Sequence, residues 1–205
     1  PNLLTDEIID WTAQSRRFMP HFHIPLQAGS DEVLRLMRRH YDTALFAERI
    51  SRIRHVMPDA FIGVDVIAGS RGETPELFDE GVRFIESLDI TRLHVFPYSE
   101  RPGTRALEIK PVNTPAVKHE RVKVLMDLSN RKFAAFTNRH SGTVRPVLVE
   151  HSLHGNTMFG FTDNYIRVAI PADPALANRI VDVELSGSVT TDEDALNGKA
   201  MEGSR

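Results

Sequence analysis

The pattern that most constrains this chain is an alternation of three short apolar stretches with helical ones. The apolar stretches lie near residues 24, 64 and 95, roughly one βα unit apart. Strands spaced in this way predict one parallel sheet with right-handed crossovers. The middle stretch, residues 60–69, is apolar almost throughout, as parallel strands buried on both faces are. Three strands do not close a barrel, so the sheet is either small and open or one part of a larger barrel.

Composition excludes several classes of site. The chain has 205 residues and no cysteine, so it holds no disulfide, no thiolate metal site and no iron–sulfur cluster of its own. No run is long enough to span a membrane, and no signal peptide is present, which fits a cytoplasmic protein. The first residue is proline rather than methionine, which suggests an excised piece.

One carboxylate interrupts the apolar middle strand. Asp65 lies inside residues 60–69, where a charge is costly unless it is paired or lies at the open end of the strand. A structural salt bridge and a role in a site both satisfy this requirement. On the first strand, His21 and His23 share one face at a spacing suited to metal ligation, but no third ligand is near, so we predict no metal site.

A polar loop follows the third strand. Its proline and glycine at positions 102 and 103 force a turn, and the loop carries several hydrogen-bonding side chains, namely Tyr98, Ser99, Arg101 and Thr104. The carboxyl ends of parallel strands are where α/β barrels place their chemistry. An ordinary connecting loop is the alternative interpretation.

The composition changes after residue 100. Ten lysines and arginines face four acidic residues between positions 100 and 145, in a protein whose net charge is −3. This basic stretch covers a predicted helix that begins at Pro115 and runs to about Asn138. A solvated helix face and an electrostatic contact with phosphate groups both account for it.

The last part of the chain predicts a small β-domain. Short strands over residues 143–150, 157–162, 165–170 and 180–185 are separated by turn signals, a spacing typical of a small barrel of OB-like size. We therefore divide the chain into domains 1–139 and 140–205. The tail from Thr191 is expected to be an edge element or disordered. Three aromatic residues of this domain, Phe159, Phe161 and Tyr165, are candidates for base stacking. Core packing is favoured for at least two of them.

Three motifs together resemble the radical-SAM methylthiotransferases. They are residues 23–31 (HIPLQAGSD) with 36–39 (LMRR), residues 63–74 (GVDVIAGSRGET) and the loop YSxRxGT at 98–104, in the family's order and spacing. The sequence of residues 94–99 (HVFPYS) looks most like that of the branch that thiomethylates N6-threonylcarbamoyladenosine beside the tRNA anticodon. The sequence departs from the family where Ala28 replaces a serine and where Ser70 and Arg71 replace Phe-Pro.

The resemblance implies an α/β fold. It would be the C-terminal half of a TIM-like radical-SAM (βα) barrel, followed by an antiparallel OB-like barrel of the TRAM type, which binds RNA. The implied cofactors of the full-length enzyme are S-adenosylmethionine and two 4Fe-4S clusters. The family's cluster-binding cysteines are absent, so the clusters cannot bind to this chain, which we expect to be inactive alone with no catalytic residue of its own.

Two sets of candidate binding residues follow. The strand ends are expected to hold S-adenosylmethionine through Gln27, Ser30, Asp65, Ile67, Gly69, Tyr98, Arg101, Gly103 and Thr104. The anticodon stem-loop of a tRNA is expected to contact Lys118, Arg121, Lys123, Arg131, Lys132, Arg145 and Arg167. The alternatives are an RNA-binding module without catalysis, a methylthiotransferase acting on isopentenyladenosine tRNA or a ribosomal protein, and a TIM-like phosphate-binding protein, for which no Gly-rich loop is found.

A partial barrel has a further consequence. Its outer strands would leave unpaired backbone groups, and its former interior would expose apolar side chains, which we expect to be Ile62, Val64, Val66 and Val95. Self-association through this open edge or face, most simply as a two-fold dimer, is therefore predicted.

Overall fold

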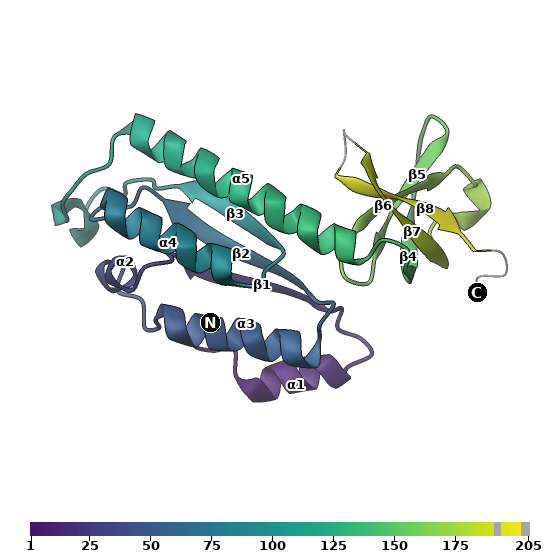
Figure 1. Cartoon of the computed structure of the whole chain (residues 1–205), viewed down its shortest axis with the longest axis horizontal. Coiled ribbons are helices and arrows are strands. Elements are labelled where there is room, and N and C mark those ends of the chain that lie inside the picture. The colour runs from purple at the N-terminus through teal and green to yellow at the C-terminus, as the bar shows by residue number, and fades with distance from the viewer. Residues whose placement is uncertain (191–193, 202–205) are drawn as a thin grey trace. The chain divides into compact units, whose positions relative to one another are not determined.

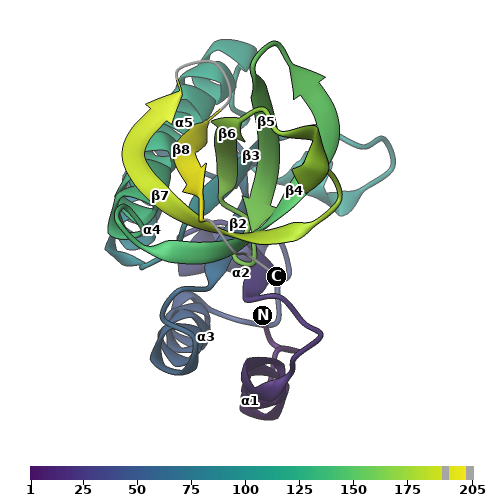
Figure 2. The same ribbon diagram turned by 90° about the vertical axis from the view of Figure 1, so that its right-hand side faces the viewer.

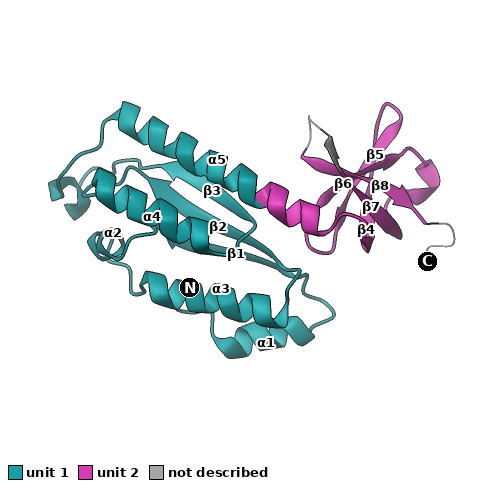
Figure 3. Ribbon diagram, viewed as in Figure 1, with its two compact units in different colours: residues 1–132 teal, residues 133–205 magenta. Residues whose placement is uncertain are grey.

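The chain folds into two compact units. A computed structural model describes residues 1–190 and 194–201. Unit 1 comprises Pro1–Lys132 and unit 2 Phe133–Arg205, so the division falls within the helix that ends at Arg139 (Figure 3).

Unit 1 is built on a parallel three-stranded sheet, as predicted. Its strands are β1 (His21–Gln27), β2 (Phe61–Ala68) and β3 (Arg92–Pro97), in the order β1-β2-β3. The helices that alternate with them are α1 (Asp6–Gln14), α2 (Asp31–Leu36), α3 (Thr43–Val56), α4 (Pro75–Ser87), the short 3₁₀ helix η1 (Arg105–Glu108) and the long α5 (Pro115–Arg139), as Figure 1 shows.

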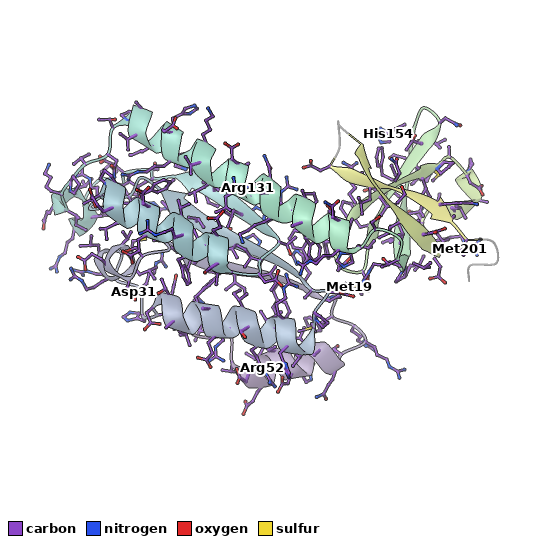
Figure 4. The ribbon with its side chains drawn as sticks, in the orientation of Figure 1. Met19, Asp31, Arg52, Arg131, His154 and Met201 are labelled. Carbon is purple, nitrogen blue, oxygen red and sulfur yellow. The ribbon has the colours of Figure 1, made fainter. Side chains whose placement is uncertain are left out.

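Local signals start these helices where the sequence indicates. The Thr5 side chain accepts from the Ile8 amide at the start of α1, and the Thr74 side chain accepts from the Leu77 amide in front of α4, whose first residue is proline. Ion pairs then join α1 to α3. The Arg52 guanidinium of α3, labelled in Figure 4, donates to Asp10 of α1 at 2.5–2.6 Å, and the Arg49 guanidinium pairs with Asp6.

The core of unit 1 lies between the sheet and its helices. Ile62, Val64 and Val66 are 0–3% exposed and pack with apolar residues of α3, α4 and the first part of α5. The prediction that these three residues would be exposed was wrong, and Val95 is also partly buried against this core. The helices cover the face that carries them, so an apolar face no longer supports self-association, which leaves the edge strands β1 and β3 as its structural basis.

Unit 2 contains a closed five-stranded barrel (Figure 2). Its strands are β4 (Val144–His154), β5 (Thr157–Thr162), β6 (Arg167–Pro171), β7 (Ile180–Thr190) and β8 (Ala195–Ala200), with the 3₁₀ helix η2 (Pro174–Leu176) between β6 and β7. The barrel order is β4-β5-β6-β8-β7, so β8 pairs on both sides and is not the predicted edge element. The remaining tail residues, 191–193 and 202–205, lie outside the described part of the chain.

A buried polar network ties the end of α5 to this barrel inside unit 2. The His140 ring bonds through Nδ1 to the Phe136 carbonyl at 2.9 Å and through Nε2 to the Asn164 amide at 3.0 Å. The Thr162 hydroxyl donates to the Asn164 side chain at 2.6 Å. Because His140 and Asn164 are 3% and 0% exposed, each bond replaces one that water would otherwise supply.

Candidate functional site: the open face and the strand ends

The sheet of unit 1 has one face that the helices do not cover, and it carries a row of polar side chains beside the apolar Ile67 and Phe96. Strand alternation puts His21 and His23 of β1, Asp65 of β2, and Arg92 and His94 of β3 on this face, opposite the buried residues. The register sets Asp65 beside His94. Side chains far apart in sequence therefore meet in a row across the three strands.

Asp65 is the hydrogen-bonding centre of this row. The His23 ring donates from Nε2 to the Asp65 carboxylate at 2.5 Å, and the rings of His23 and His94 stack with centroids 4.6 Å apart. The pairing satisfies the requirement that the sequence placed on Asp65. It also leaves the carboxylate at a face where a ligand can reach it, because Asp65 is only partly buried and His23 is exposed.

The neighbouring imidazoles influence one another's charge. Partial burial lowers the pKa of His21, and the nearby His23 and His94 lower it further. The pKa of His94 is lowered first by burial and then by His23, while the Asp65 carboxylate opposes the shift. Both rings therefore stay neutral at a pH where an isolated histidine begins to take up a proton. Within the described residues, no cluster of three or more possible metal ligands is present.

A buried ion pair holds the loop at the carboxyl end of β2. The Arg121 guanidinium of α5 contacts the Glu73 carboxylate at 2.5 Å and the Glu73 carbonyl at 3.1 Å, and the side chains are 7% and 6% exposed. The same carboxylate accepts from the Gly69 amide at 3.0 Å. Burial raises the pKa of the Glu73 carboxyl, against the opposing effects of Arg121 and Gly69.

Gly69 serves packing in this structure. Its φ is +75°, and a Cβ there would lie 2.5 Å from Cγ of Lys118 on α5. Lys118 in turn donates to the Tyr98 carbonyl at 3.0 Å and lies over the Tyr98 ring. The glycine therefore allows α5 to approach the ends of β2 and β3 closely.

Arg71 ties two loops together. Its guanidinium pairs with Glu100 at 2.7–2.8 Å and donates to the Leu107 carbonyl, and the side chain is 11% exposed. The family resemblance predicted Phe-Pro at positions 70 and 71. The Arg71 side chain thus finds hydrogen-bond acceptors on the segment after β3. A proline at this position would form no such bonds.

The other predicted cofactor residues lie at the same strand ends but differ in accessibility. Ser30 is 1% exposed, and its hydroxyl has no hydrogen-bond partner among the described residues. Gln27 adopts a φ of +73° and accepts a hydrogen bond from Arg39 at 3.2 Å, while Ile67 is partly buried on the open face. Arg101, Gly103 and Thr104 form an exposed turn, in which the Thr104 hydroxyl donates to the Arg101 carbonyl.

Most of the predicted RNA-binding residues are engaged inside the fold. Besides Lys118 and Arg121, Lys132 donates to two backbone carbonyls at 2.6–2.9 Å, and burial lowers its pKa. In unit 2, Arg145 pairs with Asp163 through two bonds of 2.9–3.0 Å, and the Arg167 guanidinium lies over the Phe159 ring. Of the seven, Lys123 and Arg131 are exposed, and Arg131 contacts Glu86 at 3.2 Å.

Sequence reasoning missed His94, Arg92 and Glu73 as members of the site. His94 had a detectable signal, because the alternation of β3 puts it with Arg92 on the face opposite the apolar Leu93 and Val95. Glu73 had none, because its partner Arg121 lies 48 residues along the chain. In the barrel, only Phe159 of the three aromatic candidates is buried, while Phe161 and Tyr165 are 38% and 49% exposed, so the expectation of core packing for two was wrong.

The fold is shared with a radical-SAM enzyme. Coproporphyrinogen III oxidase of Escherichia coli, described as a radical SAM enzyme, superposes with a TM-score of 0.54 over 92% of this chain and 45% of that one, at 15% identity. At this identity the likeness concerns the fold alone. No protein-family model matches the chain.

Sequence comparison finds relatives over most of the chain. The chain is 35% identical over 186 residues to the threonylcarbamoyladenosine tRNA methylthiotransferase MtaB of Bacillus subtilis, and 35% identical over 192 residues to the tRNA-2-methylthio-N(6)-dimethylallyladenosine synthase of Symbiobacterium thermophilum. The matches cover 89% and 93% of this chain. The chain is therefore a homologue of tRNA methylthiotransferases of both types, and it spans 41% of the length of these two relatives.

The coupling between the histidines is testable by titration. In an NMR titration of the chain, His21 and His94 should both take up protons below the ordinary histidine pKa of 6.5. Stability should fall as the pH drops below 6.5, because the unfolded chain binds these protons first. Replacing His23 by Gln should raise both pKa values without restoring them fully, since burial is the larger cause. Unchanged pKa values of His21 and His94 in His23→Gln would contradict the coupling.

Proposed function

We propose that this chain is the C-terminal part of a tRNA methylthiotransferase that modifies C2 of N6-threonylcarbamoyladenosine beside the anticodon. The observation that carries the proposal is that the three family motifs lie at the carboxyl ends of three adjacent parallel strands, where α/β barrels bind substrates. Relatives of both the threonylcarbamoyl and the dimethylallyl types match at 35% identity, so the choice of branch rests on residues 94–99.

The strand ends suit S-adenosylmethionine. The Ser30 hydroxyl is buried and has no hydrogen-bond partner among the described residues, and the Gln27 backbone is left-handed. A ligand-binding role for the end of β1 would explain both features. When bound, S-adenosylmethionine supplies the radical and the methyl group of this family's chemistry. Gln27 and Asp65 would accept from its polar groups, Ile67 would line the adenine, and Arg101 and Thr104 would lie at the rim.

The polar face has its own role in the proposal. Asp65 fixes the ring orientation of His23, and His23 in turn stacks on His94. The polar face therefore presents fixed hydrogen-bonding atoms rather than mobile ones. A neutral His94 beside a carboxylate-bound His23 can hold a proton close to a bound base. The polar face would therefore orient the target adenine and exclude water from one side of it.

The chain cannot supply the clusters. It contains no cysteine, so the ligands for two 4Fe-4S clusters would come from another part of the enzyme. The barrel of unit 2 would serve as a TRAM-like RNA-binding module. Its exposed Phe161 and Tyr165 rings have centroids 6.3 Å apart and offer a surface for base stacking. An RNA-binding module without catalysis is the second candidate, and the absent cysteines favour it.

The chain alone should be inactive. Purified protein incubated with iron, sulfide, dithionite and S-adenosylmethionine is expected to give no 5′-deoxyadenosine above a protein-free control, because nothing in it holds a cluster. The measurement is liquid chromatography with mass spectrometry, together with absorbance of any cluster formed. Cluster absorbance accompanied by product would defeat this expectation.

A chimera tests the function. The matching region of the Bacillus subtilis MtaB is replaced by this chain and expressed in a strain that lacks that enzyme. We expect tRNA to regain the 2-methylthio derivative of N6-threonylcarbamoyladenosine, measured by mass spectrometry. Asp65→Asn in the chimera should reduce the product at least about tenfold, since it removes the carboxylate charge that orients His23. The exposed Asp79→Asn is the matched control.

Three results of this experiment would contradict parts of the proposal. A folded chimera that makes no product would favour the RNA-binding module. Product on dimethylallyladenosine alone would assign the other branch. Full activity in Asp65→Asn would remove the open face from the site.

A further inference from the structure

Unit 1 contains a groove that shares no lining residue with the polar face of the sheet. It has a volume of about 770 Å³. One wall is the end of α2 and the other is η1, and its lining residues are Leu36, Met37, Arg38, Arg105, Ala106, Glu108 and Ile109. No residue predicted as a site from the sequence lines it. A groove of this size accommodates a small organic ligand or a nucleotide.

The loop after β2 packs against both walls of this groove. Gly72 has a φ of +83°, and a Cβ there would lie 2.5 Å from Cδ1 of Leu36 and 2.9 Å from Cγ2 of Ile109. The Gly72 amide also donates to the Pro111 carbonyl at 2.9 Å. Together with the hydrogen bond from Arg71 to the Leu107 carbonyl, these contacts hold η1 against the end of α2. The groove is therefore part of the ordered structure of these loops.

Two arginines of the groove differ from the engaged cations of α5. Arg38 and Arg105 are exposed, and neither guanidinium has an ion-pair or hydrogen-bond partner within the part of the chain that the structure describes. Arg38 also adopts a φ of +57° just after α2, where glycine is the preferred residue. A strained arginine with an unused guanidinium at the rim of an apolar-floored groove points to an anionic ligand.

We propose that this groove binds one nucleotide of a single-stranded RNA segment, an inference that rests on the proposed function and locates part of its tRNA contact. The apolar side chains of Leu36, Met37 and Ile109 would cover the face of a base, and the guanidinium groups of Arg38 and Arg105 would bind the adjoining phosphates. Glu108 can accept from an exocyclic amino group of the base. An acidic peptide would meet the arginines but would leave the apolar floor uncovered and face Glu108.

The test measures RNA binding to the intact chain. A fluorescein-labelled anticodon stem-loop is titrated with the protein at several salt concentrations, and anisotropy gives the affinity. The double variant Arg38→Ala/Arg105→Ala should weaken binding about tenfold or more and lower the salt slope by about 1.4, the value for two single-strand phosphate contacts. Arg16→Ala/Arg17→Ala, an equal loss of exposed charge elsewhere in unit 1, is the control and should change binding less than threefold.

A second readout locates the contact. Stem-loop RNA carrying 4-thiouridine in its loop is crosslinked by light, and the modified peptides are identified by mass spectrometry. Crosslinks to residues 36–38 or 105–109 support the proposal. Crosslinks confined to residues 133–205, affinity unchanged in the double variant, or the absence of binding by the wild-type chain would overturn it. So would displacement of the RNA by polyglutamate as effective as by unlabelled RNA. The chimera experiment tests the function separately, and its product can survive loss of the groove contact.

Discussion

The ion pair between Glu73 and Arg121 is the interaction on which the arrangement of unit 1 depends. Both side chains are almost fully buried, so each charge has lost its water and is stabilised by the other. The Gly69 amide also donates to the carboxylate, and the Glu73 carbonyl accepts from the guanidinium. The pair joins the loop after β2 to the second turn of α5. Asn113 reinforces it by donating to the carbonyls of Ser70 and Glu73 at 2.7 and 3.1 Å.

The pair fixes the positions of the groups described above. With the loop after β2 held, Arg71 and Gly72 reach the segment after β3 and shape the groove. With α5 held, Ser129 of the same helix bonds the Leu93 amide of β3 at 2.9 Å. The sheet, the loops and the helix therefore share one buried electrostatic constraint, while the polar face of the sheet is left free for a ligand.

Local features of the fold were predictable from the sequence. The Thr74-Pro75 helix start and the parallel order of three strands depend on neighbouring residues and on spacing, and the structure has both. The orientation of β2 was not predictable. Apolar residues occupy both of its faces, so alternation could not tell that Val64 faces the helices and Asp65 the opposite side.

The candidate site shows the same limit. The motifs consist of neighbouring residues and could be identified from the sequence. The partner of each lysine and arginine could not. Arg121 and Lys132 belong to a basic stretch that the sequence analysis interpreted as a solvated helix face or a phosphate contact, yet partners more than forty residues away occupy them. Conversely, Arg38 and Arg105 gave no signal, because the groove that joins them is formed by segments that are distant in sequence.

A double-mutant cycle on the buried pair tests this account most directly. Glu73→Gln and Arg121→Met are made singly and together, and unfolding in urea is followed by the fluorescence of Trp11, the single tryptophan of the chain. Each single variant should destabilise unit 1 by about 3–5 kcal/mol, because it leaves a buried charge unpaired, and the double variant should cost much less than the sum. Hydrogen exchange of residues 69–73 should quicken in both single variants. Small, additive losses with unchanged exchange would show that the pair does not organise these loops.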